Sequence, residues 1–118
     1  QNNERYVEIW GNGKAKREFM YVEDLSRFIF FAINNFNLLP NIINVGTGKD
    51  YSIKYYYKII SKIVGLKCTF VNNLSFPSGI NRKLVDTTIQ KKIGWKPIFS
   101  LEKGLRRTYK YYLEQISN

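Results

Sequence analysis

The feature that most constrains the fold is a series of short strand-like runs that alternates with amphipathic helical segments. Runs with strand character and turn residues after them predict strands over residues 5–10, 17–22, 42–45 and 68–71. Apolar residues at helical spacing predict helices over residues 24–36, 53–64 and 101–116, with a short helix between Asp86 and Gly94. This order is typical of an α/β arrangement. Because the strands are short and few, we expect a subdomain that packs on a neighbour rather than a complete doubly wound sheet.

The ends of the helices follow local capping rules. Ser52 and Ser100 are predicted N-caps, and Gly65 is well placed to end the helix over residues 53–64. Glu23 and Asp24 complement the positive end of the first helix.

The spacing of apolar side chains also predicts which helix faces are buried. In the short helix, Ile89 and Ile93 are expected to point inward. Phe30 and Phe31 point away from the inner face of the first helix, so they either cover a second surface, such as an absent domain or subunit, or pack under a local loop. The inner face of the first helix is expected to comprise Leu25, Phe28, Ile29, Ala32, Ile33 and Phe36.

The length and the cysteine content limit the classes of protein to which this chain can belong. The 118 residues suit one domain, and no apolar run approaches the roughly 20 residues that cross a bilayer. Residues 1–5 are polar and do not resemble a signal peptide, and the chain begins without Met, so we expect a piece of a longer polypeptide. The single cysteine, Cys68, excludes an intramolecular disulfide and fits a reducing compartment such as the cytoplasm.

The charge balance indicates an anionic partner. The net charge of +10 fits nucleic acid, a membrane surface or a phosphorylated small molecule, and it also fits a soluble cation without such a partner. Basic residues are scattered through every segment, which weakens the nucleic-acid interpretation. Histidine is absent, which removes the commonest general base and the commonest metal ligand, and no metal-ligand cluster is visible.

The chain lacks the sequence motifs by which dehydrogenases bind a dinucleotide and transfer protons. The dinucleotide fingerprint G-x-G-x-x-G and the Walker motif do not occur, and no Tyr is followed by Lys four residues later. Without a dinucleotide cradle or an acid–base pair, the chain alone is expected to be catalytically inactive.

The motifs that favour binding are basic and aromatic. Arg17 lies just after a glycine turn beside Lys14 and Lys16, where a guanidinium can hold a phosphate with two donors. Arg82 and Lys83 follow a Pro/Gly loop and can approach the same anion, and Trp10 offers a flat apolar face with an N–H donor. The alternatives are solvated charges for the cations and a core position for Trp10.

Several blocks resemble the GDP-L-fucose synthase family, in family order and over nearly the whole chain. The Arg-Lys-Leu-x-Asp block at residues 82–86 narrows the match to that branch of the extended short-chain dehydrogenases. The matching blocks are Trp-Gly-Asn-Gly at 10–13, Arg-Glu-Phe-Met-Tyr-Val-Glu-Asp-Leu at 17–25, Asn-Val-Gly-Thr-Gly at 44–48, Pro-x-Gly-x-x-Arg-Lys-Leu-x-Asp at 77–86, Gly-Trp-x-Pro at 94–97 and Ser-Leu-Glu-x-Gly-Leu at 100–105.

The resemblance implies an NADPH-dependent enzyme that epimerises C3 and C5 of a GDP-4-keto-6-deoxy-sugar and then reduces C4. It places the cofactor and the catalytic Ser, Tyr, Lys, Cys and His in a Rossmann half that precedes Trp10 in family order. Residues 1–118 are then expected to be the C-terminal sugar-nucleotide-binding domain, with no catalytic, cofactor-binding or metal-binding residue of their own. The expected partners are the GDP-sugar, the missing Rossmann half and a second copy in a full-length homodimer, with no nucleic acid and no membrane.

The resemblance assigns substrate contacts to Trp10, Arg17, Ser78 and Lys83, with Arg17 on the diphosphate. Two departures leave the sugar open: Ser78 stands where the family commonly has Asp, and Tyr21 where it often has His. GDP-fucose is the default, and another GDP-deoxyhexose or a GDP-heptose fits equally well. The alternatives are a UDP- or dTDP-sugar epimerase or dehydratase domain, a stand-alone basic module for nucleic acid, and a regulatory or structural fragment.

Overall fold

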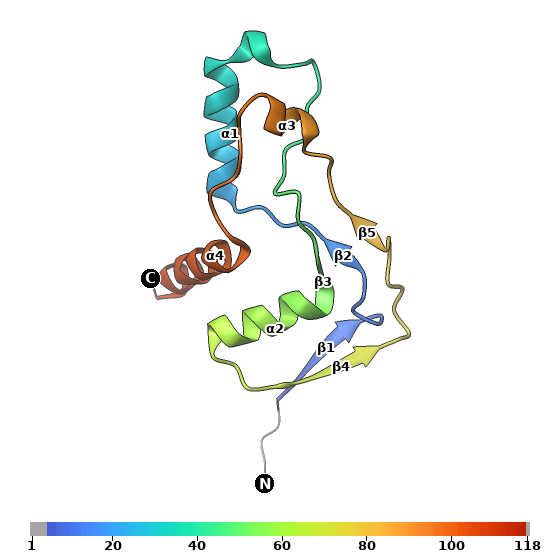
Figure 1. Ribbon diagram of the computed structural model, residues 1–118. Helices are drawn as coiled ribbons and strands as arrows, with labels where there is room; N and C mark the ends of the chain where they lie inside the picture. Colours follow the sequence, from blue (N-terminus) through green and yellow to red (C-terminus); the bar gives the residue numbers. More distant parts are fainter. Residues whose placement is uncertain (1–4, 118) are drawn as a thin grey trace.

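The computed structural model describes residues 5–117, so the signal-peptide inference falls largely on residues outside the description. Short strands and four α-helices form a mixed α/β architecture, which confirms the predicted class (Figure 1). In chain order the elements are β1 (Tyr6–Trp10), β2 (Lys16–Arg17), α1 (Val22–Asn34), the 3-10 turn η1 (Phe36–Leu38), β3 (Tyr51–Ser52), α2 (Ile53–Val64), β4 (Thr69–Asn73), β5 (Arg82–Lys83), α3 (Thr88–Lys92) and α4 (Leu101–Ile116).

The strands form two small sheets. β1 pairs in parallel with β4, with Tyr6 opposite Thr69. In the second sheet β2 is the middle strand, antiparallel to β3 and parallel to β5. Each of these three strands is only two residues long, so few ladder hydrogen bonds hold them in register.

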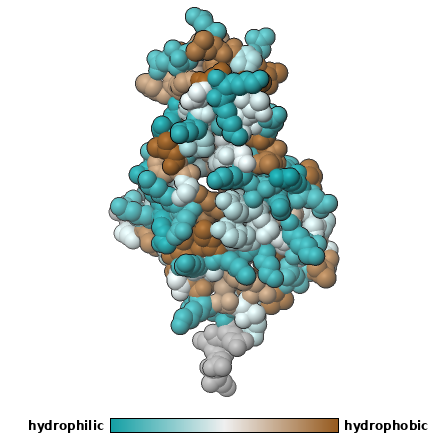
Figure 2. All heavy atoms as spheres, viewed as in Figure 1, coloured by the Kyte–Doolittle hydropathy of each residue, from teal (hydrophilic) through white to brown (hydrophobic). Residues whose placement is uncertain are grey.

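The molecule is elongated, and its core is small. The radius of gyration is 17.6 Å and the extents are 64 × 37 × 19 Å, whereas a compact domain of this length has a radius of about 13.5 Å. Figure 2 shows hydrophobic side chains at the surface of the upper end of the molecule and across its middle. The buried hydrophobic residues are Ile9, Ala15, Phe28, Tyr56, Trp95 and Phe99.

Asp24 joins α1 to the segment that precedes α4. α1 begins at Val22, and Asp24 in its first turn is fully buried. Its carboxylate accepts hydrogen bonds from the backbone N–H groups of Ile98 at 2.9 Å and Phe99 at 3.0 Å, and from Arg27 at 3.2 Å. Asp24 was expected only to complement the helix dipole, so its role in joining two segments was not predicted.

Two predicted strands differ from the structure. The strand expected over residues 17–22 is limited to Lys16–Arg17, because the neighbouring strands β3 and β5 are themselves only two residues long. Residues 42–45 form no strand, and none of the described strands lies beside them. A strand requires a paired neighbour to satisfy its backbone groups, and residues 5–117 supply none at that position.

Two predictions of buried helix faces were wrong. On α1, Phe28 is buried and packs edge-on against Trp95 at 5.1 Å, but Ile29 and Ile33 are exposed. On α3, Ile89 is exposed and Gln90 is buried instead. The Gln90 amide explains the exchange, because it bonds both the N–H and the C=O of Gly46, at 2.8 and 2.9 Å.

Phe30 and Phe31 on α1 were expected either to cover a second surface or to pack within this chain, and the structure shows one residue in each situation. Phe31 is half-buried, with its ring 6.4 Å from that of Phe28, whereas Phe30 is 71% exposed. Ile33 is 70% exposed on the same helix. α1 therefore presents a free apolar surface in this chain. None of the described helices is long and apolar enough to cross a membrane.

We expect this surface of α1 to bind a hydrophobic dye, because Phe30 and Ile33 expose neighbouring apolar side chains to solvent. Changing Phe30 and Ile33 together to Asp should lower the dye fluorescence without lowering the melting temperature. Phe28→Ala is the matched control: it should leave dye binding by the native state intact and cost about 3–5 kcal/mol of unfolding free energy. A monomeric wild-type chain that binds no dye would contradict this expectation.

Candidate functional site

Two cations lie side by side at the centre of the small sheet. Arg17 of β2 is directly opposite Lys83 of β5 in the parallel pairing. Residues in register on neighbouring strands project from the same face of a sheet. Arg17 is half-buried and Lys83 is exposed. The sheet therefore brings together two of the three cations predicted to hold the anion. The third, Arg82, forms an ion pair with Asp50 at 2.5 Å instead.

Arg17 is fixed at its backbone and at its guanidinium by neutral groups. Its Nη1 donates to the carbonyl oxygens of Lys16 at 2.7 Å and Ile80 at 2.6 Å. The phenol of Tyr56 on α2 donates to the Arg17 carbonyl at 2.8 Å. Within residues 5–117 neither Arg17 nor Lys83 forms an ion pair. Their positive charges therefore stay available to an anionic ligand.

The loop over residues 74–81 connects the remaining predicted site residues to this pair. Its Phe76 stacks on Trp10, with ring centroids 4.4 Å apart and planes within 9°. Its Ser78 lies against Gly11: a Cβ there would be 2.6 Å from the serine Oγ, so only glycine fits. The same loop supplies the Ile80 carbonyl that holds Arg17. Trp10, Ser78, Arg17 and Lys83 thus all border or belong to one loop and the strand after it.

Trp10 differs from the expectation in one respect. Its side chain is 64% exposed at the end of β1, so it is not a core residue. Its indole N–H, however, donates to Glu8 Oε1 at 2.9 Å. Since Phe76 covers one ring face, Trp10 offers a ligand its other face and edge rather than a free donor.

Glu18, the residue after Arg17, was not predicted as a site residue. Its Oε1 accepts from the Thr47 N–H at 2.5 Å, the Thr47 hydroxyl at 3.0 Å and the Gly48 N–H at 2.7 Å. Its Oε2 accepts from the Val85 N–H at 3.0 Å. A Cβ at Gly46 would lie 2.6 Å from Oε1, so glycine is needed beside the carboxylate. No pattern of residue types in the sequence marks this contact, because the groups that Glu18 binds lie 29 to 67 residues away.

Tyr56, the other residue that was not predicted, is buried, and its burial changes the pKa of its phenol. Only 3% of the side chain is exposed, and burial raises its pKa to about 12. A phenol ordinarily titrates near about pH 10. Because the pKa in the folded state is higher than in the unfolded state, the linked stability is fully present below about pH 10 and is lost as pH rises through about 12.

Tyr56→Phe is therefore expected to reduce the loss of stability between about pH 8 and about pH 11.5. At about pH 8 the variant should lose about 1 kcal/mol, because the hydrogen bond to the Arg17 carbonyl is gone. Urea unfolding at the two pH values measures both effects. Tyr111→Phe, at an exposed position, is the control and should behave as wild type. An alkaline loss of equal size in Tyr56→Phe and wild type would refute this assignment.

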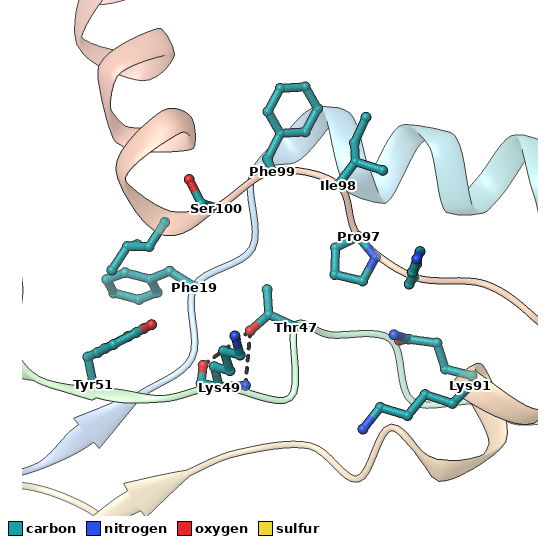
Figure 3. Close-up of a pocket in the computed structure, with 12 residues that line it drawn as sticks. Phe19, Thr47, Lys49, Tyr51, Lys91, Pro97, Ile98, Phe99 and Ser100 are labelled. Carbon is teal, nitrogen blue, oxygen red and sulfur yellow. Dashed lines mark hydrogen bonds between the residues drawn. The ribbon is translucent and has the colours of Figure 1, made fainter.

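A second basic hollow is lined by residues other than the four predicted site residues. Its volume is about 340 Å³, and Figure 3 shows Phe19 and Tyr51 at one side of it and Lys91 at the other. Lys49 and Lys96 also line it. Trp10, Arg17, Ser78 and Lys83 are not among its lining residues. The chain therefore has two basic surfaces that an anion can reach.

Neither glycine turn of residues 5–117 forms a Rossmann-type dinucleotide cradle. The turn at Gly11–Gly13 leads into the strand β2, and four residues, including β3, separate Gly48 from the start of α2. Neither glycine turn opens a helix, which the pyrophosphate of NADPH requires in the Rossmann cradle. Among the described residues there is also no group of three potential metal ligands.

The comparisons with known proteins agree with this architecture. Residues 1–46 match the NAD dependent epimerase/dehydratase family. The chain is 53% identical over 112 residues to the GDP-L-colitose synthase of Yersinia pseudotuberculosis, covering 95% of this chain and 36% of that protein. It is 43% identical over 107 residues to the GDP-L-fucose synthase of Azorhizobium caulinodans, covering 91% and 34%. The solved GDP-6-OMe-4-keto-L-xylo-heptose reductase of C. jejuni superposes with a TM-score of 0.86 at 34% identity, covering 94% and 34%.

The fold and the family match indicate the same class of protein: the chain is similar to NAD dependent epimerases and dehydratases. Within that class it resembles the GDP-L-fucose synthase family, as its motifs indicated. The chain spans about a third of the length of the curated relatives it matches.

Proposed function

We propose that this chain is the GDP-sugar-binding C-terminal domain of an NADPH-dependent epimerase/reductase similar to GDP-L-fucose synthase. The observation that carries the proposal is the pair Arg17 and Lys83, held in register, free of ion pairs within residues 5–117 and bordered by the loop over residues 74–81. The matched relatives are named for GDP-sugars, which supports the same ligand class.

Each site residue has a distinct task in this proposal. Arg17 holds the diphosphate, because a guanidinium presents paired donors to phosphoryl oxygens. Lys83 adds a second positive charge beside it. Trp10 packs the open face of its ring on an apolar part of the ligand. Ser78 offers a neutral hydroxyl where relatives commonly have a carboxylate, so the sugar stays open between a GDP-deoxyhexose and a GDP-heptose.

Catalysis and NADPH binding belong to residues outside 5–117 in this account. NADPH supplies the hydride for reduction at C4, and the described residues contribute substrate binding only. The chain alone is then inactive, and the full-length enzyme works with the Rossmann half attached, as a cytoplasmic homodimer.

Heat protection by nucleotides tests the ligand class. A ligand at about 100 times its dissociation constant stabilises the folded state by about 2.7 kcal/mol. We expect GDP and GDP-mannose to raise the melting temperature of the chain, and UDP-glucose and dTDP at equal concentration to have a smaller effect. Stronger protection by UDP or dTDP ligands would favour the UDP/dTDP-sugar alternative. Tight binding of a DNA or RNA oligomer with a steep salt dependence would favour the nucleic-acid module.

A further inference from the structure

Glu18 is adjacent to Arg17 in sequence but is not paired with it. All four hydrogen bonds to its carboxylate come from neutral donors: the N–H and hydroxyl of Thr47 and the N–H groups of Gly48 and Val85. Arg17 in turn is held by two carbonyl oxygens. Although a carboxylate and a guanidinium are sequence neighbours, each is satisfied by uncharged groups. An ion pair between them would have neutralised the cation that the ligand needs.

The carboxylate also joins the segments that carry the cation pair. Val85 is two residues after Lys83 in β5, and Thr47–Gly48 precede β3, whose Tyr51 pairs with Arg17. Glu18 therefore bonds to the segments next to β3 and β5, the two strands that pair with β2. Strands of two residues have few ladder bonds of their own, so these side-chain bonds contribute much of what fixes their register.

We propose that Glu18 is a positioning residue that holds Arg17 and Lys83 in register for a diphosphate, a role that rests on the proposed function. It touches no ligand itself. It acts by fixing β2 against β5 and against the turn over residues 46–48.

A positioning role and a simple charge effect predict opposite results for Glu18→Gln. Removing a negative charge next to a phosphate site would strengthen anion binding if charge were all that mattered. In the positioning account binding weakens, because a glutamine amide cannot offer acceptors on both sides. Its NH2 group would face either the Val85 N–H or the donors of Thr47 and Gly48.

The test is calorimetric titration of the chain with GDP and with guanosine, which lacks the phosphates. Glu18→Gln is expected to weaken GDP binding by roughly tenfold and to leave guanosine binding within about twofold. Asp24→Asn is the matched control, because it alters a different carboxylate that also accepts backbone N–H groups, at another place in the fold. It should lower the melting temperature and leave GDP affinity unchanged.

Thr47→Val is the milder variant if Glu18→Gln does not fold. It removes the hydroxyl that donates to Glu18 and that also bonds to the backbone of Lys49, and it is expected to weaken GDP binding by roughly two- to threefold. In an Arg17→Ala background, most of the GDP loss caused by the Glu18 or Thr47 change should disappear, since there is no guanidinium left to position. A purely structural role would cost the same in both backgrounds.

The outcomes separate the two proposals. If the folded Glu18→Gln chain binds GDP as well as or better than wild type, while Arg17→Ala binds it weakly, the positioning role is overturned and the proposed function stands. If wild type shows no GDP binding, or Arg17→Ala has no effect on it, the proposed function fails and the role of Glu18 fails with it. If Glu18→Gln weakens the binding of GDP and of guanosine equally, the positioning role of Glu18 is also overturned.

Discussion

Arg17→Ala is expected to raise the KM for the GDP-sugar by about 10- to 100-fold and to leave kcat nearly unchanged, in the active enzyme that carries this chain. A hydrogen bond to a charged group contributes about 1.5–3 kcal/mol, which sets the size of the effect. The diphosphate keeps its charge during epimerisation and hydride transfer. An interaction that is equally strong in the ground and transition states affects KM and not kcat. Steady-state kinetics over a range of GDP-sugar concentrations measure both constants.

The controls for Arg17 separate geometry from charge. Arg17→Lys should recover only part of the affinity, because an ammonium lacks the planar pair of donors. Lys83→Ala should act in the same direction with a smaller effect. Arg106→Ala changes the net charge equally but alters a residue paired with Glu102 on α4, so it should match wild type. An unchanged KM in Arg17→Ala would show that Arg17 is a solvated surface charge.

Asp24→Ala is expected to lower the free energy of unfolding by about 3 kcal/mol. The side chain is fully buried, and its removal leaves the N–H groups of Ile98 and Phe99 without their acceptor. The Phe99 N–H is buried and has no direct access to water as a replacement. Chemical denaturation followed by circular dichroism measures the change.

A matched acidic residue tests whether burial is the cause. Glu102 also accepts a hydrogen bond from an arginine, Arg106, but it is half exposed on α4. The arginine holds the pKa of this carboxyl below its usual range without fixing any backbone group. Glu102→Ala should leave the melting temperature nearly unchanged. Equal losses in the Asp24 and Glu102 variants would contradict the role assigned to Asp24.

Features that depend on neighbouring residues were predictable from the sequence. Ser52 and Ser100 cap α2 and α4, with their side chains accepting the N–H groups of Tyr55 and Lys103 as expected. Gly65 ends α2 in the left-handed conformation, also as expected. These contacts lie within three residues or so, where local rules apply.

Features that depend on distant segments were not predictable in the same way. Residues 42–45 have strand composition but no paired strand among residues 5–117. The Gln90 amide takes the buried place expected for Ile89 because Gly46, 44 residues away, needs both of its backbone groups satisfied. The spacing of apolar residues predicts which side chains share a helix face. It does not predict which distant segment of the chain packs against that face.

The residues of the candidate site also differ in whether the sequence could predict them. The motif resemblance selected Arg17 and Lys83, and the sheet places them opposite one another. Glu18 was missed because its partners lie 29 to 67 residues away, and Tyr56 because its partner lies 39 residues away. In both cases side chains bond to backbone groups, which leaves no pattern of residue types in the sequence.

The most direct test of the central claim is chemical-shift mapping of GDP on the isotope-labelled chain. We expect the largest shifts at the Arg17 guanidinium, the Lys83 ammonium, the Ser78 N–H and the Trp10 indole, with saturation as GDP is added. Shifts confined to Lys49, Lys91 and Lys96 would instead place the nucleotide in the second basic hollow and would contradict the assignment of the site to Arg17 and Lys83.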